Sequence, residues 1–168
     1  GKVGIIAHVA GTSSAIERSE GFMERMKEKY PDIKVLPVQY SDGDPQKAMD
    51  KTIDMIQANP DLAGIYGTNE GSTLGVANAI DSQNLKGKVK VIGFDSTEAI
   101  INFLKNGVIQ GFVVQDAYQI GYQGIKTLNA ALSGQAVEKE IDIPVKFVNA
   151  ENINTPEIDK LLHPFGKK

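Results

Sequence analysis

Four polar side chains of this sequence stand at places where a parallel β-sheet would bring them together. Arg18 lies one turn into the segment that follows the first apolar run, and Asn69 and Asp95 follow two later apolar runs. Gln115 ends a further run. A guanidinium donates hydrogen bonds, a carboxylate accepts them, and a primary amide does both. Because each sugar hydroxyl is also donor and acceptor, this set suits a neutral polyhydroxylated ligand.

Each of these residues also has an ordinary structural interpretation. Asn69 is a typical turn residue, Asp95 a typical helix cap, and Gln115 a surface residue. Their common position after strand ends favours a binding site, because ligands of open parallel sheets bind beyond the carboxyl ends of the strands. His8 also ends an apolar run, where its ring could contact a ligand.

The elements that would position these side chains alternate between strand and helix. Short apolar runs predict strands at 3–8, 33–40, 62–67, 90–94 and 108–114. Amphipathic segments predict helices at 15–30, 44–59, 72–83 and 97–106. Ser14 and Glu17 have the spacing of a capping box at the first helix, and Asp44-Pro45 opens the second.

This alternation predicts an α/β fold with three αβα layers and a five-stranded parallel sheet in the order 2-1-3-4-5, the flavodoxin-like topology. The C-terminal part departs from it. A helix at 116–132, a strand at 141–148 and a short helix ending near 162 form a helix-strand-helix appendage. Pro144 suggests an edge position for that strand.

Several function classes lack support in the sequence. The net charge is −3 and no basic patch contains interleaved aromatics, which argues against a nucleic-acid partner. There is no cysteine, and neither histidine belongs to a metal-ligand cluster. Phosphate-binding glycine motifs, a nucleophile elbow and a nucleophile–base pair are also missing. We therefore expect no catalysis, metal or cofactor, and no apolar run reaches the ~18 residues of a membrane span.

The sequence closely resembles the C-terminal half of ribose-binding-type proteins, the periplasmic or cell-surface sugar receptors of bacterial ABC importers. Collinear phrases over nearly the whole chain carry the resemblance: AGTSSAIERSEGF, ANPDLAGIYGTNEGSTLGVANAI, VKVIGFDSTEAI and GFVVQDAYQIGYQGI. It implies a monosaccharide or small polyol as ligand, a membrane permease as partner, and a periplasmic location, or a cell-surface lipoprotein in a Gram-positive organism. The residues that match the family's sugar contacts are Arg18, Asn69, Asp95 with its neighbour Phe94, and Gln115.

Two positions depart from the family pattern. The family often places an aromatic ring in the loop after the second strand, where this sequence has Gly43, with Tyr40 nearby. An apolar sugar face would lose a stacking partner there, so the resemblance does not name the sugar. His8 stands where a small residue is common, and it is the residue that could compensate.

The resemblance also implies a division of the chain. Residues 1–115 match the C-terminal lobe, 116–150 would cross a hinge into an N-terminal lobe that precedes Gly1, and 151–168 would return as a helix and tail. Without that lobe, residues 116–150 either pack on their own sheet or exchange with a second copy in a homodimer. One lobe holds half of the site, so we expect weak sugar binding.

A second family shares this fold and similar loop phrases: the effector-binding cores of lac-repressor-type regulators. A helix-turn-helix upstream would indicate the regulator, and a signal peptide the receptor. The tail IPVKFVNAENINTPEI is more similar to the importer proteins, which favours the receptor.

Overall fold

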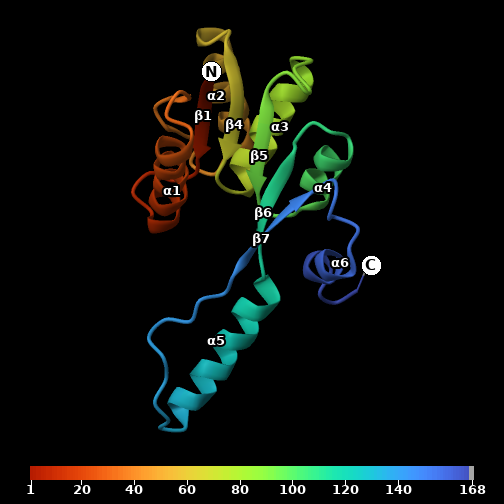
Figure 1. The fold of residues 1–168 in the computed structure, drawn as a ribbon. Coiled ribbons are helices and arrows are strands. Elements are labelled where there is room, and N and C mark those ends of the chain that lie inside the picture. Colours follow the sequence, from red (N-terminus) through yellow and green to blue (C-terminus); the bar gives the residue numbers. More distant parts are fainter. Residues whose placement is uncertain (167–168) are drawn as a thin grey trace.

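A computed structural model describes residues 1–166 of the 168-residue chain (Figure 1). Its strands are β1 (Lys2–Ala7), β2 (Lys34–Val35), β3 (Gln39–Tyr40), β4 (Leu62–Gly67), β5 (Lys90–Phe94), β6 (Gly111–Gln115) and β7 (Val145–Asn149). Its helices are α1 (Ser13–Lys29), α2 (Pro45–Ala58), α3 (Glu70–Ser82), α4 (Glu98–Lys105), α5 (Ala117–Leu132) and α6 (Pro156–Leu162). The end of the tail expected at 151–168 lies outside the described residues.

The α/β fold and the order of the predicted parallel strands are confirmed. The sheet runs β2-β1-β4-β5-β6-β7, and β3 also pairs with β1. The strand predicted at 33–40 is divided into β2 and β3, which pair with the two ends of β1. Pro37 lies between them, and proline has no amide hydrogen to donate to a sheet ladder.

The sheet also has an antiparallel edge that the sequence did not predict. β7 pairs with β6 from Gly111↔Asn149 to Gln115↔Val145. Residues 145–149 therefore pack on this sheet, although they belong to the segment that the resemblance assigned to a second lobe. Pro144 directly precedes this edge strand, and the start of an edge strand is one of the few sheet positions that accept proline.

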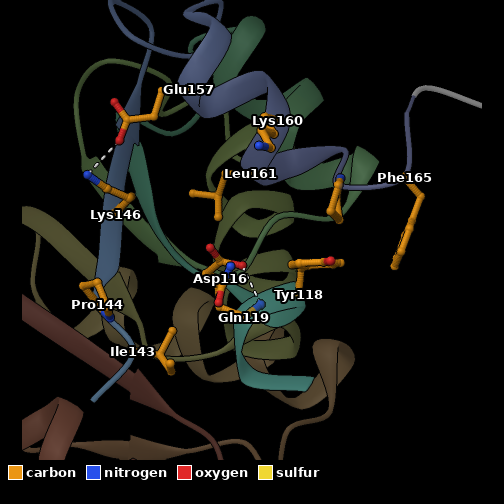
Figure 2. A pocket seen from close by; sticks show the side chains of 11 residues that line it. Asp116, Tyr118, Gln119, Ile143, Pro144, Lys146, Glu157, Lys160, Leu161 and Phe165 are labelled. Atoms are coloured by element: carbon orange, nitrogen blue, oxygen red, sulfur yellow. Dashed lines mark hydrogen bonds and ion pairs between the residues drawn. The ribbon is translucent and has the colours of Figure 1, made fainter. Parts of the chain in front are cut away.

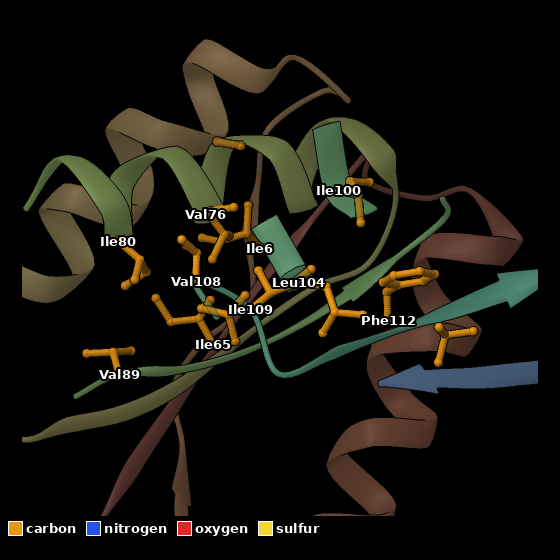
Figure 3. Close-up of a cluster of buried hydrophobic side chains, with 14 of the residues drawn as sticks. Ile6, Ile65, Val76, Ile80, Val89, Ile100, Leu104, Val108, Ile109 and Phe112 are labelled. Carbon is orange, nitrogen blue, oxygen red and sulfur yellow. The ribbon is translucent and has the colours of Figure 1, made fainter. Parts of the chain in front are cut away.

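The core lies between the sheet and helices α2, α3 and α4, of which Figure 3 shows the part around α3. Val76 and Ile80 of α3 and Phe112 of β6 are fully buried within it. Val148 and Ile158 join the same cluster, so the C-terminal appendage contributes to the core of this lobe. Figure 3 shows α1 on the other side of the strands, which completes the αβα layers.

Helix α5 projects away from this body (Figure 1). Asp116 caps it by accepting a hydrogen bond from the Gln119 amide at 2.9 Å. Within 117–132 no residue is buried, and the side chains of Ile125 and Leu132 are 70% and 80% exposed. Residues 135–144, which follow, form neither helix nor strand. Much of the apolar surface of α5 is therefore exposed.

Helix α5 is expected to exchange its amide hydrogens far faster than the core helices. An isolated helix of this length is marginal in water, because most helix stability comes from packing. We expect exchange-protection factors at least roughly a hundredfold lower for peptides from 117–132 than for peptides from 70–82 of α3. Hydrogen–deuterium exchange with mass spectrometry measures both at once. Equal protection would mean that α5 is covered in solution, for example by a second copy.

Candidate ligand-binding site

The structure brings all the predicted site residues to the carboxyl-end edge of the sheet. Arg18 comes from α1, and the others follow or end β1, β4, β5 and β6. Hydrogen bonds and one cation–π contact, some of them to Thr68 and Glu70, engage five of them: His8, Arg18, Phe94, Asp95 and Gln115. The strand-end argument therefore placed them correctly. Their role as sugar contacts stays a prediction.

The Arg18 guanidinium is held in position by two contacts at this edge. Its Nη1 donates to the Thr68 carbonyl oxygen at 2.8 Å, and its guanidinium carbon lies 3.7 Å from the centre of the Phe94 ring. Phe94 is only 6% exposed, so it forms a fixed base under the guanidinium. A guanidinium has five N–H donors in a rigid fork. The remaining donors are thus held in a fixed position.

Asp95 supplies the acceptor. One carboxylate oxygen accepts from Gln115 Nε2 and the other from the Glu70 amide, each at 3.2 Å. The backbone of Asp95 has φ +70°, in the left-handed region that few residues other than glycine, asparagine and aspartate adopt. A carboxylate oxygen can accept more than one hydrogen bond, so Asp95 keeps lone pairs for a ligand.

Asn69 has both a structural and a potential binding role. Its Oδ1 accepts from the Ser72 amide at 3.0 Å, so it caps α3. This cap explains why the helix begins at Glu70, two residues before the predicted start. The Nδ2 group remains a donor. It lies 3.8 Å from the place where a Cβ on Gly43 would be, so the glycine leaves space beside it.

His8 is held by hydroxyl groups on both sides. Its Nδ1 lies 3.1 Å from Thr68 Oγ1 and its Nε2 lies 3.0 Å from Ser14 Oγ. The capping box predicted for Ser14 is wrong, because α1 is preceded by Thr12 and has no side-chain cap. Burial and, second, the nearby Arg18 lower the pKa of His8, while Asp95 opposes them. His8 is therefore mostly neutral near pH 7. It lies close to Arg18, and both side chains contact Thr68.

Acidification is expected to destabilise the fold through His8. Since the pKa of His8 is lower in the folded chain, the unfolded chain binds the proton first as the pH falls below about 6.5. The free energy of unfolding then decreases until the pH passes the folded-state pKa. Urea unfolding at several pH values measures this for the wild type and for His8→Gln. A smaller decrease in His8→Gln is expected, and equal decreases would contradict the assignment.

Tyr66 is a neighbour of this site that the sequence analysis missed. It lies inside β4, 8% exposed, and stacks on Phe22 of α1 with ring centres 5.3 Å apart. Burial raises its pKa; Arg18 lowers it and Asp95 raises it further, which places the phenol near both charges. Strand alternation alone does not tell which helix layer covers a given residue, so no sequence signal distinguished Tyr66 from a core residue.

A separate cavity of about 690 Å³ lies between the start of α5, β7 and α6 (Figure 2). Tyr118, Leu161 and Phe165 line it, with the ion pair between Lys146 Nζ and Glu157 Oε1 at 2.8 Å. None of the predicted site residues lines this cavity. Of these residues Phe94 is buried, and the others are partly exposed.

Residues 1–166 contain no group of three or more histidine, aspartate or glutamate side chains placed to hold a metal ion. None of their helices is long and apolar enough to cross a membrane.

Sequence comparison finds a matching family described as periplasmic binding protein domain, over residues 1–136. The ribose import binding protein of Haemophilus influenzae is 30% identical over 84% of this chain and 47% of its own length. The D-allose-binding periplasmic protein of Escherichia coli is 33% identical over 82% of this chain and 44% of its own. The chain thus spans about half the length of these relatives.

Solved structures show the same relationship. A carbohydrate transporter solute-binding protein from Agrobacterium radiobacter, in complex with D-arabinose, has a TM-score of 0.93 and 41% identity, and the match covers 96% of this chain and 55% of that one. An ABC transporter solute-binding protein from Agrobacterium vitis with bound D-fucose has a TM-score of 0.90 and 37% identity, over 94% of this chain and 54% of that one.

Proposed function

Because this chain belongs to the periplasmic binding protein domain family, we propose that it binds a monosaccharide or small polyol as one lobe of the solute-binding component of a bacterial ABC importer. The observation that carries this proposal is the convergence of Arg18, Asn69 and Asp95 at one sheet edge. These side chains offer fixed donors and acceptors to neighbouring hydroxyls of a sugar ring. Gln115 orients the carboxylate through its 3.2 Å hydrogen bond.

The names of the relatives suggest a ligand class, a partner and a cellular location. Their names mention ribose, allose, arabinose and fucose, which are neutral pentoses and hexoses. We propose the same class here, a membrane permease as partner, and a location outside the cytoplasm, with lipid anchoring in a Gram-positive organism. The relatives are named as binding proteins, which supports a role without catalysis and favours a receptor over a regulator.

A second lobe would complete the site. The apolar residues of α5 are exposed, and residues 135–144 form neither helix nor strand. We propose that residues 116–144 pack on an N-terminal lobe, while β7 and α6 stay with this one. The competing possibility is a homodimer in which two copies swap this segment. Sedimentation of the chain at several concentrations distinguishes a monomer from such a dimer.

The test is a titration of the ¹⁵N-labelled chain, followed by NMR, with D-ribose, D-allose, D-arabinose and D-fucose. We expect shifts at Asn69, Asp95 and Gln115 with a Kd of about 1 mM or weaker, because half a site supplies only about 4 kcal/mol. No shift with any sugar at 100-fold this concentration argues against sugar binding. Micromolar affinity would contradict the half-site.

A further inference from the structure

The sheet opens between β4 and β5 at the end that carries the candidate site. The ladder between these strands ends at Tyr66↔Ile92. Beyond it, the Thr68 amide donates to the Ile6 carbonyl at 3.1 Å on the β1 side. The Asp95 amide donates to the Val113 carbonyl at 2.8 Å on the β6 side. The two strand ends that lead to Asn69 and Asp95 therefore follow different neighbours.

Thr73, in the first turns of α3, fills this opening. The Phe94 amide donates to its Oγ1 at 2.8 Å, where a strand carbonyl would otherwise accept. The hydroxyl lies 3.2 Å from the Phe94 carbonyl and 3.3 Å from that of Gly67, and it donates its one hydrogen to either. Thr73 is fully buried. A single side chain thus bridges the ends of β4 and β5.

The packing around Thr73 leaves no space for adjustment. A Cβ on Gly93 would collide with Thr73 Cγ2 and lie 3.0 Å from its Oγ1. Glycine at this position of β5 is therefore required by the methyl group, and the hydroxyl is required by the Phe94 amide. The methyl group and the hydroxyl of Thr73 together determine the position of Phe94 at the end of β5.

We propose that Thr73 is a positioning residue of the binding site. It sets the distance between the strand end that bears Thr68 and Asn69 and the one that bears Phe94 and Asp95. Because Phe94 supports the Arg18 guanidinium, a displaced Phe94 moves both the donor and the acceptor of the site. The effect on sugar affinity rests on the proposed function, whereas the effect on site geometry does not.

The test compares three variants of the full chain. Thr73→Val keeps the shape and removes the hydroxyl, and Thr73→Ser keeps the hydroxyl. Thr52→Val is the matched control, since Thr52 is also fully buried and donates to a backbone carbonyl, that of Ala48 at 2.7 Å in α2. The readouts are the Arg18 Nε–H and Gln115 side-chain amide resonances, the exchange rate of the Phe94 amide, and the Kd for the sugars of the panel.

Thr73→Val is expected to shift both side-chain resonances and to speed exchange of the Phe94 amide. It should also weaken sugar binding about three- to tenfold, which corresponds to the loss of one hydrogen bond. Thr73→Ser should keep these signals near wild type, and Thr52→Val should lower stability without moving them. If Thr73→Val does not fold, Thr73→Ala replaces it.

Two results would overturn the proposal: unchanged resonances and exchange in Thr73→Val, or equal changes in Thr52→Val. If the wild type binds no sugar of the panel, the proposed function fails. The resonances and exchange rates still decide the positioning role in that case.

Discussion

Replacing Arg18 by methionine is expected to weaken sugar binding by about 10- to 100-fold. A hydrogen bond to a charged group contributes about 1.5–3 kcal/mol, and no other side chain at this edge offers a fork of donors. Methionine keeps much of the length and can rest on Phe94, so the change removes donors more than packing. In an NMR titration the variant should give a Kd about 10- to 100-fold higher than that of the wild type.

The matched control is Arg25→Met on the same helix. Arg25 is exposed and pairs with Glu28 at 2.9 Å, away from the site. Its replacement should leave the Kd of the wild type unchanged. The Kd of Arg18→Lys should lie between those of the wild type and Arg18→Met, because lysine keeps the charge but lacks the planar fork of donors. Wild-type affinity in Arg18→Met would remove Arg18 from the site.

The largest effect on stability is expected from Gly75→Ala. Gly75 of α3 lies against the first turns of α2, and a Cβ there would collide with Ala48 Cβ and the Pro45 carbonyl and lie 2.7 Å from the Met49 amide nitrogen. Backbone atoms cannot turn away as a side chain can, so the two helices must separate. We expect a loss of about 3 kcal/mol or more in the free energy of unfolding, measured by urea denaturation.

Gly124→Ala is the control for this substitution. Gly124 lies in α5, and a Cβ there would meet nothing within 4 Å. Alanine has a higher helix propensity than glycine by about 1 kcal/mol, so this variant should be neutral or slightly more stable. If Gly75→Ala behaved in the same way, the close approach of α2 and α3 would not exist in solution.

The exposed apolar surface of α5 bears on the two-lobe proposal. Its Ile125 and Leu132 are 70% and 80% exposed, and residues 135–144 form neither helix nor strand. The relatives are about twice as long as this chain. An affinity increase on adding the N-terminal half of a relative, with new exchange protection in α5, would support the two-lobe proposal.

Much of the site could be predicted because its geometry follows from a simple rule. In a parallel sheet all strands end at the same edge, so residues such as Asn69, Asp95 and Gln115 are brought together by their position after strands. What could not be predicted is how each side chain is engaged. Asn69 caps α3, and Ser14 bonds to His8 and not to the helix start.

The sequence by itself determined the α/β fold, the order of the parallel strands and the edge where the site residues gather, because these depend on hydrophobic periodicity and on the handedness of βαβ connections. Only the tertiary structure decided that residues 145–149 form an antiparallel edge strand on β6, and that the Thr73 side chain bridges the ends of β4 and β5. These contacts join residues distant in sequence, and they depend on which backbone groups remain unpaired once the sheet has formed.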